Sequence, residues 1–245
     1  MKSLNKRALS FITLIAGFLL ITGCNKEDNP AVPEGIKNSD IKVLILKDGG
    51  TEDTVYSVLF KAGFDVTVGE FFYNFDGRFI DGYNLVIFLN GVNYNYDISD
   101  SVQQKLKNYV RDGGTLLTTE WMTYSTNYYQ LLREILPSMY NGGYEYGTET
   151  YTKMTDHTIT EGLPASFSIS NDDWAYSFTT VYANSQSTNL TVLFSGDKSG
   201  AALSIGTFNQ GKSIHWNMAG AYYSNTIWTP EVKMILINIA KYSGM

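Results

Sequence analysis

Short apolar runs alternate with amphipathic segments through the first half of the chain. Four of the runs are dominated by aliphatic and aromatic side chains, which is typical of strands buried in a parallel sheet. They cover residues 41–46, 64–68, 85–89 and 115–119. Residues 52–62, 99–111 and 128–136 instead repeat apolar side chains at helical spacing, and Pro137 ends the last of these segments. The order of strands and helices predicts a parallel sheet with right-handed crossovers.

The second half of the chain has shorter and more polar elements. Residues 144–154 are aromatic and polar and are expected to be extended, and residues 156–164 form a turn-rich segment. Three short strands and a final helix are predicted at residues 190–194, 201–206, 213–218 and 228–242. We therefore expect an α/β fold with a flavodoxin-like parallel sheet flanked by helices and with added short strands in the C-terminal half.

Residues 1–23 have the pattern of a signal peptide. A basic start precedes an apolar run, residues 8–21, that is too short to be assigned as a membrane span. The small residues before Cys24 resemble the lipobox of bacterial lipoproteins, which implies cleavage before Cys24 and acylation of the new amino terminus. An ordinary secretory signal is the alternative, but Cys24 is the only cysteine in the chain and occupies this one position.

The mature chain is expected to begin with a tether and to continue as one domain. Residues 24–40 carry two prolines and many polar side chains, which favours a flexible tether, and residues 41–245 form the single domain. Residues 25–28 resemble the surface-export tag of some Gram-negative lipoproteins, although a solvated linker has the same composition. Acylated Cys24 would hold the protein on the outer membrane through membrane lipid, with exposure at the cell surface left open.

Charge and composition narrow the class of partner. The formal net charge is −6 at pH 7, and three of the 18 basic residues precede Cys24, so the mature chain carries 24 acids against 15 bases. This excess of acids argues against nucleic acid as a partner. The lack of a second cysteine excludes an intrachain disulfide and a thiolate metal site. The two histidines lack metal-binding spacing, so we expect no metal, and we expect no cofactor.

A candidate site follows the strand at residues 115–119. In an open α/β sheet, ligands bind at the carboxyl ends of the strands, where Glu120 stands here. Asp48 and Asn90 follow two earlier strands and are expected at the same edge. Glu120 could act as a general base or orient a sugar hydroxyl; a solvated or amide-bonded strand-end acid is the alternative. A glycosidase would also need a second carboxylate, for which Asp48 is the candidate.

Tyrosine is abundant, with 18 residues, and many aromatic side chains fall in loops or at the ends of predicted elements. Trp121, Tyr124 and Tyr222 are candidates for ligand binding, because exposed rings near amides and acids suit the apolar faces and hydroxyl rims of sugars. The alternative is that these rings cover the core. The candidate ligand-binding set combines these three aromatic residues with the three polar residues at the strand ends.

Three other features are weaker functional signals. His157 lies in the turn-rich segment and is expected to bond the backbone locally, and His215 lies within a predicted strand and is expected to be a satisfied core or surface residue. Residues 206–213 match the phosphate-binding P-loop pattern, but the residues that follow have the composition of a strand. We interpret residues 209–211 as a hairpin turn and the match as a coincidence.

Several segments come in the order of a known superfamily. They are residues 82–88, 107–114, 157–164, 211–216 and 238–242. Together they resemble the class I glutamine amidotransferase-like superfamily, especially its trehalose-utilisation (ThuA-like) branch and the amidotransferase-like domain of some β-galactosidases. The resemblance covers residues 41–243 and implies an amidotransferase-like α/β fold.

The resemblance also locates a catalytic dyad that this chain lacks. In the amidotransferases a cysteine follows the strand that corresponds to residues 115–119, and a histidine and a glutamate follow a late strand. Here the first position is Glu120, and the late strand ends in residues 217–220, which contain no histidine. Hydrolysis of glutamine by thiolate attack is therefore excluded.

Three functions are compatible with these patterns. The first is a non-catalytic amidotransferase-like domain that binds a glycan or a protein partner. The second is a carbohydrate-active hydrolase or isomerase that uses Glu120 with a second acid. The third is a structural subunit of a surface complex, for which a large apolar patch is expected. A second acid near Glu120 in a deep cleft favours the enzyme, and a shallow aromatic surface favours binding.

Overall fold

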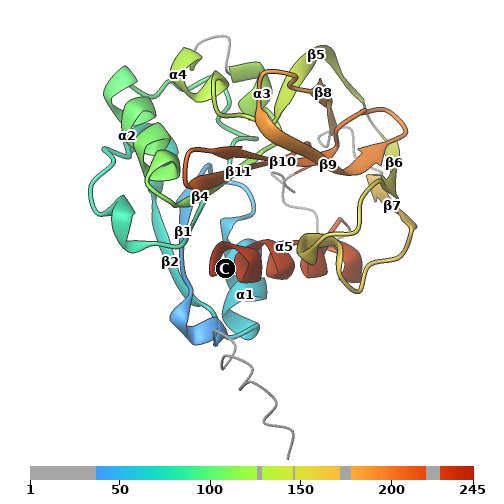
Figure 1. Ribbon diagram of the computed structural model, residues 1–245, viewed down its shortest axis with the longest axis horizontal. Coiled ribbons are helices and arrows are strands. Elements are labelled where there is room, and N and C mark those ends of the chain that lie inside the picture. Colours follow the sequence, from blue (N-terminus) through green and yellow to red (C-terminus); the bar gives the residue numbers. More distant parts are fainter. Residues whose placement is uncertain (1–36, 126–128, 146, 172–177, 219–226) are drawn as a thin grey trace, which may run out of the picture. The chain divides into compact units, whose positions relative to one another are not determined.

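A large mixed sheet forms the centre of the domain. The computed structural model describes residues 37–125, 129–145, 147–171, 178–218 and 227–245. The sheet has nine strands in the order β2–β1–β3–β4–β11–β10–β9–β6–β7 (Figure 1). A separate two-stranded sheet pairs β5 with β8. Residues 36–245 form one compact unit.

Parallel strands make up one half of the large sheet. They are β1 (Lys42–Lys47), β2 (Asp65–Phe71), β3 (Leu85–Phe88), β4 (Thr115–Thr119) and β11 (Gly211–Trp216). β3 and β4 are buried along their whole length, as their apolar sequences predict for strands covered on both faces. β2 lies at the edge of the sheet and is largely exposed. The predicted α/β fold with a parallel sheet and flanking helices is confirmed.

Antiparallel strands extend the same sheet. They are β10 (Leu203–Phe208), β9 (Thr188–Gly196), β6 (Gly147–Lys153) and β7 (Ser166–Asn171). The small sheet consists of β5 (Ser138–Glu145) and β8 (Phe178–Ala183). The strands expected in the C-terminal half correspond to β9, β10 and β11. β7, β8 and most of β5 are not among the predicted strands; the alternation of serine with Phe167 and Ile169 is the signal that would have predicted β7.

Helices cover both faces of the parallel strands. The α-helices are α1 (Glu52–Lys61), α2 (Asp100–Arg111), α3 (Met122–Ser125), α4 (Gln130–Arg133) and α5 (Pro230–Ser243). The short 3₁₀ helices are η1 (Asn38–Asp40), η2 (Phe72–Asn74), η3 (Ile80–Gly82) and η4 (Thr158–Thr160). α1 and α5 lie together on one face, in a core cluster with Val43 and Ile45 (Figure 1). α2, α3 and α4 contribute to a second cluster with Leu44 and Leu46, as the two-residue period of β1 requires.

Two helix starts follow the sequence signals that predict them. The Ser99 hydroxyl accepts a hydrogen bond from the Val102 amide at 3.4 Å and caps α2. Thr229 caps α5 through the Val232 amide, also at 3.4 Å, and Pro230 takes the first helical position. No helix within the described ranges is long and apolar enough to cross a membrane.

The helix expected at residues 128–136 is shorter than predicted. α4 ends at Arg133, and residues 134–136 are non-helical or turn residues before β5 begins at Ser138. Pro137 disfavours the helical conformation at the residue before it, so the apolar side chains of Ile135 and Leu136 are buried outside a helix.

The segment that matches the P-loop pattern is a β-hairpin. Phe208 pairs with Gly211, which leaves Asn209 and Gln210 as a two-residue turn, and Asn209 has a positive φ of 54°. The segment leads into β11 and not into a helix that could bind phosphate at its amino terminus. The interpretation as a hairpin turn is confirmed.

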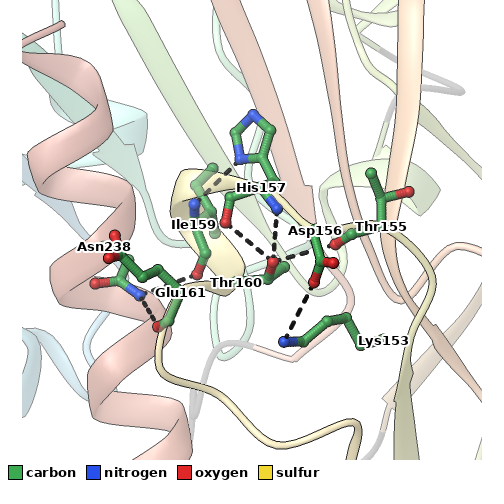
Figure 2. Close-up of polar contacts among 8 residues, drawn as sticks. All are labelled: Lys153, Thr155, Asp156, His157, Ile159, Thr160, Glu161 and Asn238. Atoms are coloured by element: carbon green, nitrogen blue, oxygen red, sulfur yellow. Dashed lines mark hydrogen bonds and ion pairs between the residues drawn. The ribbon is translucent and has the colours of Figure 1, made fainter. Parts of the chain in front are cut away.

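The turn-rich segment after β6 is held by a set of local hydrogen bonds (Figure 2). His157 Nδ1 accepts from the Ile159 amide at 3.1 Å, and the Thr160 hydroxyl accepts from the His157 amide at 2.9 Å, so both side chains cap η4. Asn238 of α5 donates to the carbonyl groups of Ile159 and Glu161 at 3.1 and 2.9 Å. The expected backbone-bonding role of His157 is confirmed, and the turn is tied to α5.

Candidate functional site

Three polar side chains of the predicted site lie beyond the carboxyl ends of neighbouring parallel strands. Asp48 follows β1, Asn90 follows β3 and Glu120 follows β4. β1, β3 and β4 are adjacent in the sheet, so the three residues share one edge. The exposed fraction is 0 % for Asp48 and Asn90 and 2 % for Glu120. The structure therefore brings the polar candidates together, but inside the protein and not on its surface.

The Asp48 carboxylate joins the loops that follow β1 and β3. Its Oδ2 accepts hydrogen bonds from the backbone amides of Gly91 and Val92, the latter at 2.8 Å, and its Oδ1 accepts one from Gly50 at 3.2 Å. Burial raises the pKa of Asp48 to about 6, although the Gly91 and Val92 amides lower it. At neutral pH Asp48 is mostly ionised, and its hydrogen bonds connect the two loops.

Glu120 occupies a strained turn directly after β4. Its φ is 42°, in the left-handed region that residues other than glycine rarely adopt. The surrounding structure fixes this conformation: the Glu120 amide donates to the Trp216 carbonyl at 2.8 Å, and the Thr179 hydroxyl donates to the Glu120 carbonyl at 2.9 Å. The chain therefore makes a sharp, rigid elbow between β4 and α3.

The environment of the Glu120 side chain favours the protonated acid. Burial raises the pKa of Glu120 well above its usual range, and the charge of Asp48 raises it further. Oε2 has no hydrogen-bond partner among the described residues. A buried, protonated carboxyl can donate a hydrogen bond but cannot accept a proton, so this arrangement opposes a role for Glu120 as a general base at neutral pH.

Asn90 connects β3 to the elbow. Its backbone amide donates to the Thr119 hydroxyl at 3.1 Å, and its carbonyl accepts from the Trp121 amide at 2.9 Å. The side-chain Nδ2 donates to the Ser125 hydroxyl at 3.4 Å, while Oδ1 has no partner among the described residues. Asn90 is thus mainly a structural bridge that leaves one acceptor unused.

The late strand, after which the resembled amidotransferases carry a histidine and a glutamate, is β11, and Asn217 is the first residue that follows it here. The Tyr151 hydroxyl donates to Asn217 Oδ1 at 2.7 Å. Asn217 Nδ2 donates to the Ser199 hydroxyl at 3.1 Å and to the Thr179 carbonyl at 3.4 Å. The side chain is fully buried and its donors and acceptor are engaged, so this position is structural in this protein.

His215 lies in the core of the sheet. Its Nδ1 is 3.1 Å from the Thr118 hydroxyl, but Nε2 has no partner among the described residues. Burial lowers the pKa of His215 to about 3, so the ring is neutral at physiological pH. The expected core position of His215 is confirmed, whereas only one of its two ring nitrogens has the expected hydrogen-bond partner.

Aromatic side chains beside the elbow form a connected group, which we call the aromatic cluster. Its members are Tyr94, Trp121, Tyr124, Tyr140 and Tyr144. Trp121 stacks on Tyr94 with ring centroids 5.0 Å apart, and it contacts Tyr124 at 5.7 Å and Tyr144 at 5.5 Å. Tyr140 joins through Tyr124, at 5.4 Å. β5 packs against α3 and brings Tyr140 and Tyr144 to the elbow.

The aromatic cluster has a buried end and an exposed end. Trp121 is 9 % exposed, which corrects the expectation of an exposed ring at the elbow, whereas Tyr144 is 47 % exposed. Tyr124 and Tyr140 are half-buried, and burial, followed by the nearby Tyr124 and Tyr144, raises the pKa of Tyr140. The exposed end therefore offers ring faces together with hydroxyl groups.

Sequence reasoning missed Tyr140, since nothing in the sequence shows that β5 returns to the elbow. Tyr222 and Cys24 lie outside the described residues. A groove of about 540 Å³ lies between α1 and α5, with Val58, Ala62 and Ile237 in its wall, and it contains none of the candidate residues. Within the described residues, no group of three or more histidine, cysteine or acidic side chains could hold a metal ion.

Comparison with known proteins decides the family. The family model for ThuA, described as trehalose utilisation, matches residues 43–229. The chain belongs to the ThuA family. This agrees with the branch that the sequence segments indicate, while no curated protein matches the chain in sequence.

Solved structures share the fold of this ThuA domain at low sequence identity. A cytoplasmic protein of Salmonella typhimurium LT2 is 16 % identical with a TM-score of 0.60, over 82 % of this chain and 98 % of that one. A ThuA-like protein of Parabacteroides merdae is 14 % identical with a TM-score of 0.64, over 84 % and 90 %. A β-galactosidase of Bacillus circulans is 16 % identical with a TM-score of 0.60, over 84 % of this chain and 31 % of that one. At these identities the similarity shows the fold alone.

Proposed function

We propose that this ThuA domain binds a carbohydrate at the aromatic cluster and catalyses no reaction. The aromatic cluster carries the proposal, because a half-exposed Tyr144 ring joins through Trp121 to the half-buried Tyr124 and Tyr140, whose ring centroids are 5.4 Å apart. Sugars present apolar ring faces bordered by hydroxyl groups, and stacked aromatic rings with phenolic donors and acceptors match both features.

The polar residues of the elbow support a binding role over a catalytic one. Glu120 is buried and favours its protonated form, and the Asp48 carboxylate accepts hydrogen bonds from the backbone amides of Gly91 and Val92. Asn217 is engaged by Tyr151 and by neighbouring groups. The hydrogen bonds of Asp48 and Asn217 stabilise the segments around the elbow, on which Trp121 forms the buried base of the aromatic cluster.

The proposal places the domain at a membrane surface. Its support is the sequence around Cys24, which resembles a lipobox and would give a lipid-anchored protein of the outer membrane, held by membrane lipid. The similar Salmonella typhimurium protein is described as cytoplasmic, so the fold by itself does not indicate a location in the cell. Palmitate labelling in bacterial cells tests this part: we expect label on the wild type and none on Cys24→Ser, and an unlabelled wild type would refute the anchor.

A glycan array tests the binding proposal, with residues 36–245 as the probe. We expect at least one glycan to bind, and we expect Tyr144→Ala to lose the signal. Tyr182→Ala is the matched control, since Tyr182 is also 47 % exposed and lies in the same small sheet, outside the aromatic cluster. An array with no bound glycan, or signals that survive Tyr144→Ala, would reject the sugar site. If the domain instead captures a surface protein and this capture depends on Tyr144, the ligand of the aromatic cluster is a protein and not a glycan.

The alternative is a carbohydrate-active hydrolase or isomerase that uses Glu120 with a second acid. Two observations favour it: the strained φ of Glu120, and a neighbouring Asp48 that titrates lower than Glu120, as an acid and base pair requires. Turnover of a bound sugar by the wild type, abolished in Glu120→Gln while binding persists, would establish this alternative and reject the non-catalytic one.

A further inference from the structure

Phe79, directly before η3, combines two unusual features. Its side chain is 85 % exposed, and its backbone has a φ of 62°, in the left-handed region. A bulky residue is rarely found in this conformation, and a large exposed ring is unfavourable in water. Residues that combine backbone strain with exposure of an apolar side chain are candidates for a binding surface.

The loop around Phe79 is rigid. The Arg78 guanidinium contacts the Asp76 carboxylate at 2.5 Å, and the Arg78 amide donates to the same side chain at 2.9 Å. Lys105 of α2 donates to the Asp76 carbonyl at 2.6 Å, and Ile80, the residue after Phe79, is buried in the core. The ring of Phe79 is therefore presented on a fixed backbone, which lowers the entropy lost when it binds.

A pocket opens beside this ring. Its volume is about 230 Å³, and Phe79 itself, Leu44, Leu46, Phe75 and Tyr83 contribute to its wall. This volume lies below the roughly 300–1,000 Å³ of small-molecule sites and suits a single side chain. The pocket lies on β1 and β2, at the edge of the sheet, where β2 pairs with β1 and with no other described strand.

We propose that the protein forms a two-fold dimer in which Phe79 of each copy enters this pocket in the other copy. In a two-fold interface the same surface patch of both copies meets, so a ring and a pocket on one patch allow each copy to bury its ring in the pocket of the other. Glu70, Asp76 and Arg78 also border the pocket, and Arg78 pairs with Asp76 of its own chain at 2.5 Å; the rotation that exchanges the rings brings this pair towards Glu70 of the other copy, whose charge Arg78 then offsets. This self-complementarity identifies a second copy of the chain as the occupant.

Sedimentation velocity of residues 36–245, from about 1 µM to about 1 mM, tests the dimer. We expect a reversible monomer–dimer equilibrium, and we expect Phe79→Asp to remain monomeric throughout. Phe60→Asp is the matched control, because Phe60 is 59 % exposed on α1 and is not part of the pocket. A wild type that is monomeric at every concentration, or a dimer that persists in Phe79→Asp, would overturn the proposal.

Two further variants separate the contact from an effect on folding. Phe79→Gly relieves the positive φ, so we expect its melting temperature to rise while the dimer is lost. Arg78→Glu is expected to weaken the dimer at least tenfold, and the charge swap Glu70→Arg with Arg78→Glu to restore it. A dimer that survives Phe79→Gly, or a swap that fails to restore association, would show that the proposed two-fold contact is wrong.

Discussion

Replacing Asp48 by asparagine tests whether the candidate site holds a buried charge. The folded protein raises the pKa of Asp48 from 3.8 to about 6, mainly through burial. An acid with a raised pKa stabilises the folded state fully only below its unfolded pKa, and this contribution is lost as the pH rises through its folded pKa. The wild type should therefore lose stability between pH 4 and pH 7 relative to a variant that cannot ionise at this position.

The size of the effect follows from the shift. One unit of pKa corresponds to about 1.4 kcal/mol, so a shift of about two units corresponds to about 3 kcal/mol. Asparagine can accept hydrogen bonds through only one side-chain oxygen, so Asp48→Asn loses at least one contact with the Gly50, Gly91 and Val92 amides at every pH, at about 1–3 kcal/mol. The stability that Asp48→Asn loses with the hydrogen bond and the stability that it gains by not ionising can be measured separately, because only the gain changes with pH.

Urea unfolding at pH 4, 5.5 and 7.5 measures both terms. We expect the unfolding free energy of the wild type minus that of Asp48→Asn to fall by about 2.5 kcal/mol between pH 4 and pH 7.5, because a small part of the effect is already lost at pH 4. Because the charge of Asp48 raises the pKa of Glu120, the comparison should be repeated in a Glu120→Gln background. A difference that stays constant with pH in both backgrounds would refute the buried, perturbed Asp48.

Three further variants test the elbow and the turn. Glu120→Gln removes an acid whose ionised form is destabilised by burial, which raises its pKa. Thermal unfolding should therefore show a variant more stable than the wild type at neutral pH, with a difference in stability that disappears towards pH 4.5. Equal stability of the two proteins at neutral pH would contradict the raised pKa. Asn217→Ala leaves the buried Tyr151 hydroxyl without its acceptor and removes the bonds from Asn217 to Ser199 and Thr179, so it should lower the unfolding free energy in urea by about 2–4 kcal/mol; a loss below about 1 kcal/mol would contradict the network. His157→Ala removes the cap of η4 and should cost about 1 kcal/mol at pH 7.5. Because burial, followed by Lys212, lowers the pKa of His157, the contribution of this histidine should shrink as the pH falls below 6.5, and a cost that grows there would contradict the assignment.

The hydrophobic pattern was sufficient for the parallel half of the fold. β1, β3 and β4 are short apolar runs buried on both faces, and Ser99 and Pro230 mark helix starts that the structure contains. The small sheet was beyond this reasoning, because β5 contains polar residues and two glycines and pairs with β8 across a long stretch of sequence. Pattern and propensity report local preference, whereas such pairing depends on tertiary packing.

The candidate site shows the same division. The positions of Asp48, Asn90 and Glu120 follow from the rule that parallel strands end at one edge. Their burial does not follow from it, since it depends on the groups packed above the strand ends, and the role of Tyr140 depends on the return of β5 to the elbow. The sequence thus predicts two members of the aromatic cluster, Trp121 and Tyr124, whereas its exposed end depends on the tertiary fold.

The most direct test of carbohydrate binding at the aromatic cluster is isothermal titration of residues 36–245 with the best glycan from the array. Loss of one stacking ring is worth about 1.4 kcal/mol or more, so Tyr144→Ala should weaken binding about tenfold or more, and the equally exposed Tyr182→Ala should bind as the wild type does. Equal affinity of Tyr144→Ala and wild type would contradict the site.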